Sequence, residues 1–103
     1  MSLKDKIIRQ IGFNPDDEQE CLKAIKRYAY NIVFISNPSK KVQLAAVEQD
    51  PYSIQYINNP SIELQKLAIY SSRYDIGVIV LCPDWKEFEK EIEDNMMIKD
   101  IIE

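Results

Sequence analysis

Apolar positions recur along this chain at spacings of three and four residues, the periodicity of an amphipathic α-helix. The clearest instance runs from Lys40 to Gln49. Prolines and clusters of Asn, Asp and Ser separate such segments, and they are typical of helix boundaries. We therefore predict an all-α fold. The inward face of the 40–49 helix is predicted to consist of Val42, Ala45, Ala46 and Gln49, widened by Leu44 and Val47.

This pattern returns after 22 residues. The segment NPSKKVQLAAVEQDPYSIQYIN, which begins at Asn37, aligns without gaps with NPSIELQKLAIYSSRYDIGVIV, which begins at Asn59. A weaker copy begins at Asn14 and has one extra residue in its acidic opening. Such self-similarity is typical of helical repeat proteins, in which each unit packs on its neighbours. The shared columns include Ala24/Ala46/Ala68, Tyr30/Tyr52/Tyr74, Ile32/Ile54/Ile76 and Ile35/Ile57/Ile79. The alanine and isoleucine columns are predicted to face inward.

Each copy is predicted to contain a long helix followed by a short one. Asn37-Pro38-Ser39 is a helix start signal, because Asn or Ser accepts hydrogen bonds from free backbone N–H groups and proline suits the first turn. Asp50-Pro51 repeats this signal and predicts a short second helix. We predict a short α-solenoid of about three helix pairs, with repeats over 14–36, 37–58 and 59–82.

Two further helices are predicted at the ends of one domain, 1–103. Residues 1–13 carry a capping signal at Ser2 and an apolar stripe suited to covering the first repeat. Residues 83–103 form an acidic helix, for which Asp84 and Glu87 stand at N-cap and N3 spacing. The two apolar stripes are Leu3, Ile7, Ile8 and Ile11, and Trp85, Phe88, Ile92 and Met96.

Aromatic residues supply the candidate contact surface. Because Tyr30, Tyr52 and Tyr74 share one column, we expect a ladder of tyrosines along one side of the stack. The common arrangement is partial burial between units, with the hydroxyl at the rim. The alternative is a binding stripe, since tyrosine is enriched at interface hot spots. Tyr56 and Phe34 are further candidates, and with Tyr28 and Tyr70 they are expected to form a surface patch.

The net charge of −4 is unevenly distributed, with +3 over residues 1–41 and −7 over residues 42–103. Nucleic-acid binding is disfavoured, because it is driven by Lys and Arg neutralising phosphates. The sequence has no run of eighteen apolar residues and no hydrophobic leader, so we expect a cytoplasmic protein without membrane contact. In that compartment Cys21 and Cys82 are expected to remain free thiols.

Candidate chemistry is sparse. Histidine, the commonest general base and metal ligand, is absent, and the two cysteines lack CxxC spacing. Two glycines, Gly12 and Gly77, are too few for a phosphate-binding loop. The alternating glutamates of residues 87–93 point about 200° apart on a helix and do not converge. We therefore expect no catalytic residues, metal or cofactor, and no enzymatic activity.

The stretch NPSKKVQLAAVEQDPYSIQYINNP resembles a short helical tandem repeat of uncharacterised bacterial and phage proteins, with copies close to NPSEEVQLAAVKQNPYAIQYIK. It is also distantly similar to HEAT-type and leucine-rich-variant repeats. The resemblance is specific over residues 37–60, weaker to Pro83, loose over 14–36, and does not cover the ends. It implies a helical-repeat fold and macromolecular contact, and it brings no catalytic residues.

Three functions remain open from the sequence. The leading hypothesis is a non-enzymatic protein–protein interaction module, such as a phage or mobile-element protein that binds a host protein. The second is a structural homo-oligomer subunit, for which the apolar tail Met96–Ile102 would supply contact surface. The third is an acidic inhibitor that imitates the charge of nucleic acid, using the −7 half of the chain.

Overall fold

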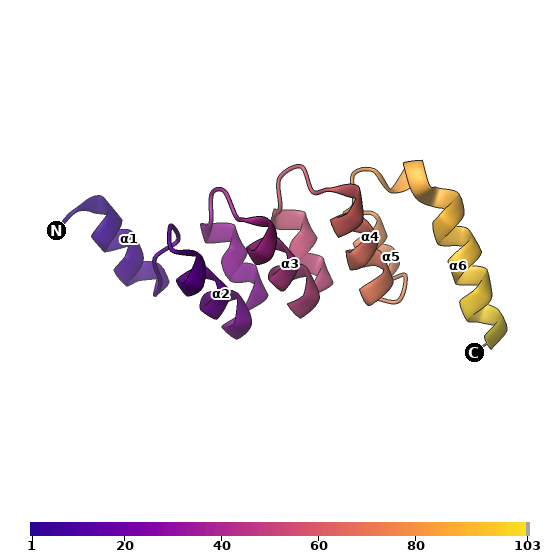
Figure 1. Ribbon diagram of the computed structural model, residues 1–103, viewed down its shortest axis with the longest axis horizontal. Coiled ribbons are helices and arrows are strands. Elements are labelled where there is room, and N and C mark those ends of the chain that lie inside the picture. The colour runs from indigo at the N-terminus through magenta and orange to yellow at the C-terminus, as the bar shows by residue number, and fades with distance from the viewer. Residues whose placement is uncertain (103) are drawn as a thin grey trace.

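The computed structural model describes the backbone of residues 1–102 and the side chains of residues 1–96, and within this range all regular structure is helical. The predicted all-α class is therefore confirmed. The molecule is elongated, with extents of 59 × 25 × 19 Å, and the first and last helices lie at opposite ends of its long axis (Figure 1). Across the described residues, no helix is both long enough and apolar enough to cross a membrane.

The helices between the two ends form two rows. In the long-helix row, α3 packs between α2 and α4, and in the short-helix row, η2 packs between η1 and α5. The hydrophobic core lies between the rows. The α-helices are α1 (Leu3–Ile11), α2 (Glu18–Arg27), α3 (Lys40–Gln49), α4 (Ile62–Ser71), α5 (Ile76–Ile79) and α6 (Glu89–Ile102). The 3-10 helices are η1 (Ala29–Phe34), η2 (Pro51–Tyr56) and η3 (Trp85–Phe88).

Each long helix begins at a side-chain cap, and successive caps lie 22 residues apart in the sequence. The capping oxygen accepts a hydrogen bond from the backbone N–H three residues later, which satisfies a donor that the helix itself cannot pair. The expectation that proline occupies the first turn is wrong for Pro38 and Pro60, because the serine after each is the N-cap. The capping pairs are Asp17 with Glu20, Ser39 with Val42, and Ser61 with Leu64, at 3.1, 3.2 and 3.1 Å.

A second side chain in each long helix ties the helix to the loop before it. The residue four positions after the N-cap donates to the carbonyl oxygen of the proline that precedes the helix. Cys21 takes the same place as two glutamines, so this column has a structural role. The donors and acceptors are Cys21 Sγ and Pro15, Gln43 Nε2 and Pro38, and Gln65 Nε2 and Pro60, at 3.3, 3.0 and 2.9 Å.

The alanine column forms the tightest part of the core. Ala24, Ala46 and Ala68 have no exposed surface, in agreement with the predicted inward column. Two members of the predicted face of α3 do not belong to it. Leu44 and Gln49 are exposed, and Gln49 instead donates through Nε2 to the carbonyl of Lys26 on α2, at 3.1 Å.

The third unit departs from the ungapped alignment. Ile76, aligned with the buried Ile54, is 63% exposed, and Val78 is buried in its place. The cause is a turn after α4, in which Arg73 and Tyr74 adopt left-handed backbone conformations with φ of 57° and 63°. This turn delays the start of the short helix, so Ile76 leaves the predicted inward column of Ile32 and Ile54. The second predicted column remains buried throughout, at Ile35, Ile57 and Ile79.

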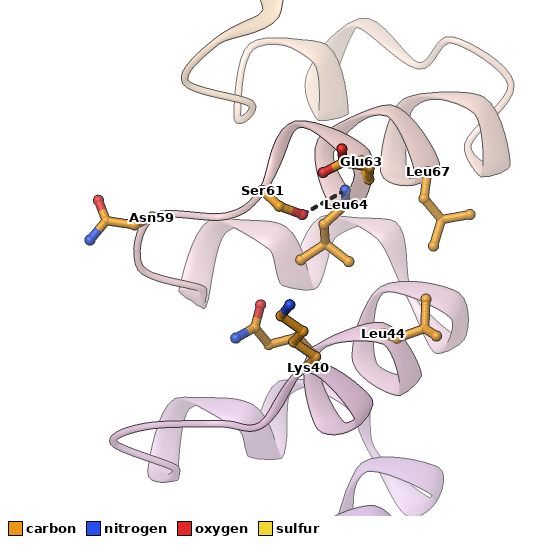
Figure 2. Close-up of a pocket in the computed structure, with 8 residues that line it drawn as sticks. Lys40, Leu44, Asn59, Ser61, Glu63, Leu64 and Leu67 are labelled. Carbon is orange, nitrogen blue, oxygen red and sulfur yellow. Dashed lines mark hydrogen bonds between the residues drawn. The ribbon is translucent and has the colours of Figure 1, made fainter.

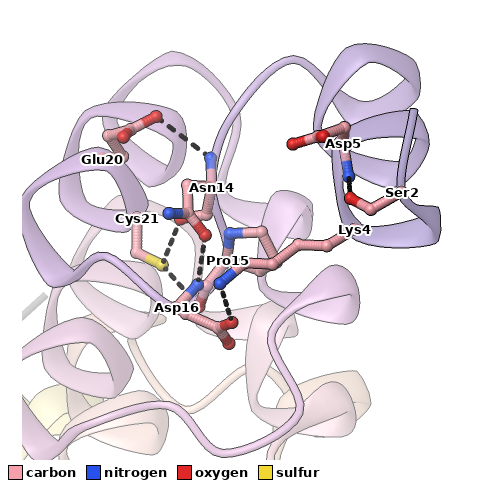
Figure 3. Close-up of polar contacts among 8 residues, drawn as sticks. All are labelled: Ser2, Lys4, Asp5, Asn14, Pro15, Asp16, Glu20 and Cys21. Carbon is pink, nitrogen blue, oxygen red and sulfur yellow. Dashed lines mark hydrogen bonds and ion pairs between the residues drawn. The ribbon is translucent and has the colours of Figure 1, made fainter.

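The N-terminal helix forms as predicted but covers little of the hydrophobic core. Its N-cap, Ser2, accepts a hydrogen bond from Asp5 N–H at 3.1 Å, and Lys4 pairs with Asp16 at 2.9 Å (Figure 3). However, α1 buries none of its own residues, and Leu3 is 73% exposed. Phe13, which follows the helix, is the residue that enters the core. The predicted stripe of α1 therefore does not seal the first unit.

The C-terminal segment contacts α4 through a few side chains of η3 and α6. Phe88 and Ile92 are buried, and Lys66 on α4 pairs with Glu91 at 2.8 Å. The predicted capping role of Asp84 is wrong, because Asp84 pairs with the buried side-chain amide of Gln65. Its N–H donates to Gln65 Oε1 at 2.9 Å, and its carboxylate accepts from Nε2 at 2.8 Å. Of the predicted tail Met96–Ile102, the side chains after Met96 lie outside the described residues.

Ala46→Asp should lower the free energy of unfolding by about 3 kcal/mol, because it places a charge without a partner where the long helices meet. Leu44→Asp on the same helix is the matched control, and it should cost about 1 kcal/mol or less because Leu44 is exposed. Urea unfolding followed by circular dichroism measures both. Equal losses would contradict the assignment of Ala46 to the contact between helices.

Glu91→Gln should modestly lower the melting temperature at pH 7 and leave it unchanged near pH 3. The hydrogen bond from Lys66 holds the pKa of the Glu91 carboxyl below its ordinary value of 4.5. A carboxyl whose pKa is lowered by folding stabilises the folded state at any pH above its pKa in the unfolded chain. This contribution is lost as the pH falls through its pKa in the folded protein. Thermal melts of the wild-type protein and of Glu91→Gln between pH 3 and pH 7 test this ion pair. A difference in melting temperature that does not change with pH would contradict it.

Candidate protein-interaction surface

Three tyrosines form a cluster on the short-helix row. The ring centroids of Tyr28 and Tyr30 lie 5.3 Å apart, and those of Tyr30 and Tyr56 lie 5.4 Å apart. The planes are tilted by 56° and 70°, the edge-to-face geometry that aromatic rings prefer. Tyr28 is 58% exposed and Tyr56 41%, while Tyr30 between them is half-buried. The cluster therefore presents rigid aromatic surface to the outside.

Local structure explains how the cluster is held. Tyr28 ends α2 in an extended conformation and leads into η1, and Tyr56 is the last residue of η2. Because η1 and η2 pack side by side, Tyr30 and Tyr56 come into contact although they lie 26 positions apart in the sequence. Burial, and then the nearby Asp50 carboxylate, raise the pKa of Tyr30 above its ordinary value. Tyr30 therefore stays neutral at physiological pH.

The short-helix row has few charges, although the Asp50 carboxylate lies beside Tyr30. Segments 28–39, 51–62 and 76–83, which contain the short helices, have no charged residue. In contrast, every long helix carries charged residues. Further exposed apolar side chains of the short-helix row are Val33, Phe34, Ile76 and Val80. We call these four and the three clustered tyrosines the aromatic face.

The three tyrosines of the predicted ladder are all half-buried, as the predicted partial burial requires, but they make different contacts. The Tyr52 hydroxyl donates to Asp75 at 2.9 Å, which joins η2 to the start of α5, and this hydrogen bond raises the pKa of Tyr52. Tyr74 contacts Tyr70 instead, with centroids 5.7 Å apart. Tyr52 thus connects neighbouring units. Tyr30 and Tyr56 of the predicted contact set lie in the cluster, and Phe34 is exposed on the same row.

Sequence reasoning missed part of this face. Val33 and Val80 were not candidates, and Ile76 was assigned to the core. A signal was available, since the alternation of charged long helices with uncharged short ones is visible in the sequence. Together with exposed apolar residues, that alternation indicates an interface, whose core is depleted of charge.

A groove lies on the long-helix row, away from the aromatic face. It has a volume of about 730 Å³ and separates α3 from α4 (Figure 2). Leu44, Leu64 and Leu67 supply its apolar surface, and Lys40 and Glu63 add charges of both signs. This groove is where the exposed Leu44 lies. Its mixed charge makes it a less distinctive contact surface than the aromatic face.

The two cysteines are buried and free. Burial raises the pKa of Cys82 to about 11, and burial followed by the nearby Asp17 carboxylate raises the pKa of Cys21. Cys21 Sγ lies in a polar corner with Asn14, Pro15 and Glu20, where it faces backbone carbonyl oxygens (Figure 3). Neither environment favours the thiolate, the form that reacts or binds metal.

Comparisons with protein-family models, curated proteins and solved structures found no match for this chain. Among the described residues, no three or more His, Cys, Asp or Glu side chains lie together in a group that could hold a metal ion. Functional inference therefore depends on the geometry and chemistry of the chain itself. The aromatic face is its most distinctive surface.

Native protein should react with a thiol reagent at pH 8 about a hundredfold more slowly than unfolded protein, or slower still. The thiolate fraction of Cys82 falls by about this factor when its pKa rises from 9.0 to about 11, and burial blocks access as well. Titration with and without urea measures the two rates. Rapid reaction of one thiol in the native protein would contradict the burial of Cys21 or Cys82.

Proposed function

We propose that the protein is a short α-solenoid of about three helix pairs, flanked at its ends by α1 and α6, and that it acts as a non-enzymatic protein–protein interaction module. The two rows of helices and the 22-residue spacing of the long-helix caps support the repeat architecture. The resemblance of residues 37–60 to bacterial and phage repeats supports it independently. Solenoids present extended surfaces, which suits contact with another macromolecule.

The aromatic face is the observation on which this proposal depends. Interface cores are enriched in tyrosine and depleted of charged residues, and a contact centre of that kind is exposed here on one row of helices. Tyrosine gives a large contact area at a low cost in conformational entropy, because only two side-chain torsions must be ordered. The packed rings of Tyr28, Tyr30 and Tyr56 lower this cost further, since each limits the motion of its neighbour.

The chemistry of the face favours protein over nucleic acid as its partner. A nucleic-acid surface needs Lys and Arg at the contact, and the short-helix segments contain neither. We propose a cytoplasmic protein partner, such as a host protein bound by a phage or mobile-element protein. An inhibitor that imitates nucleic acid would use the acidic C-terminal half instead of this face.

The double variant Val33→Lys/Ile76→Lys tests the proposal. Both side chains are more than half exposed, at 56% and 63%, so the fold should be retained. Two charges in an apolar contact should weaken partner binding at least tenfold. Partners are identified by cross-linking in the native cell, and their affinities for each purified variant are then measured by calorimetry.

Leu44→Lys is the matched control, because it adds a charge at an exposed apolar position on the long-helix row. It should bind the partner as the wild-type protein does. A partner lost with Leu44→Lys and kept with the double variant would place the interface in the groove between α3 and α4. A partner displaced by duplex DNA and insensitive to both changes would favour the acidic inhibitor.

A further inference from the structure

The aromatic face suits a second copy of the same chain. In a two-fold symmetric interface the same patch occurs on both subunits, so any charge near the axis meets a like charge. Segments 28–39, 51–62 and 76–83 reduce this penalty because they contain no charged residue, which leaves the Asp50 carboxylate beside Tyr30 as a charge next to the cluster. We propose that the aromatic face is the interface of an antiparallel homodimer. The inference rests on the proposed function, because it takes the same face as the contact surface.

Charge along the long axis selects the antiparallel order. The first 41 residues carry +3 and the remainder −7, and α1 and α6 lie at opposite ends of the molecule (Figure 1). A parallel pair would bring the acidic ends together. An antiparallel pair places the basic end of each copy beside the acidic end of the other. Exposed charges for this contact are Lys6 and Arg9 on α1 and Glu89 and Glu93 on α6.

The antiparallel dimer also explains why α1 has an apolar side that is not buried within one chain. This helix is strongly amphipathic, yet none of its residues is buried, and Leu3 and Ile7 are exposed beside basic side chains. A helix of nine residues is marginal by itself in water. In an antiparallel dimer, α1 of one copy lies near the acidic C-terminal helix of the other. The apolar side of α1 can then pack against the other copy, and its basic side chains can pair with acidic ones there.

The available area fits a reversible dimer. Three elements packed about 10 Å apart span roughly 30 Å, and a width of about 20 Å then gives about 600 Å² per copy, or about 1,200 Å² in total. That value lies at the lower limit for specific interfaces, so the dimer should dissociate on dilution. A foreign partner that binds the aromatic face would compete with the second copy. Dimerisation would therefore regulate access to the aromatic face.

Sedimentation equilibrium of the full chain over a range of concentrations tests the dimer directly. We expect a mass that rises with concentration towards twice the 12.1 kDa of one chain, and a dissociation constant that increases at least several-fold between 50 mM and 500 mM NaCl. A single-chain mass throughout would overturn the inference. The interaction-module proposal would survive that result if Val33→Lys/Ile76→Lys still lost a cross-linked partner.

The face and the order of the two copies are tested by variants. Val33→Lys/Ile76→Lys should give a monomer and Leu44→Lys a dimer; the reverse result would overturn the choice of face. Lys6→Glu/Arg9→Glu should weaken the dimer at low salt, and combining it with Glu89→Lys/Glu93→Lys should restore the affinity. Failure of this rescue, with each variant shown to be folded by circular dichroism, would overturn the antiparallel order.

Discussion

The complete burial of Ala24, Ala46 and Ala68, one on each of the packed helices α2, α3 and α4, is the constraint on which the rest of the structure depends. A side chain of one methyl group lets neighbouring helices pack without a gap, and interiors tolerate little change in volume. The proline carbonyl at the start of each unit accepts a hydrogen bond from the long helix and orients it. The alanine column thus leaves no exposed surface at the centre of the long-helix row, and the hydrogen bonds fix each long helix to the loop before it.

This two-row arrangement separates charge from apolar surface. The long helices place their charged residues in solvent, while the short helices contain none and expose aromatic and aliphatic side chains instead. The short helices are 3-10 or four-residue α-helices, too short to bury all of their apolar residues. The surplus apolar surface is therefore a direct consequence of the fold. It is also the surface that we propose for protein contact.

The two ends of the stack differ in how they are attached. At the C-terminal end, α6 is held by buried Phe88 and Ile92 and by the pairing of Lys66 with Glu91. At the N-terminal end, α1 is held by its link to Phe13 and by an exposed ion pair, which contributes little stability. A basic helix with an uncovered apolar side thus stands at one end, and an acidic helix packed on the core stands at the other. Because the two ends differ in charge, parallel and antiparallel pairs of the molecule are not equivalent.

The sequence by itself determined the helical class, the starts of the long helices and the buried alanine column, because capping and helical periodicity are local properties. It also carried the uncharged short-helix segments. Only the tertiary structure decided that Tyr30 meets Tyr56, that Tyr52 binds Asp75, that Asp84 pairs with Gln65 and that Ile76 faces solvent. These outcomes depend on distances between units and on the left-handed turn at Arg73 and Tyr74, which non-glycine residues rarely adopt. Residue type does not encode that turn, so the alignment could not reveal the shift it causes.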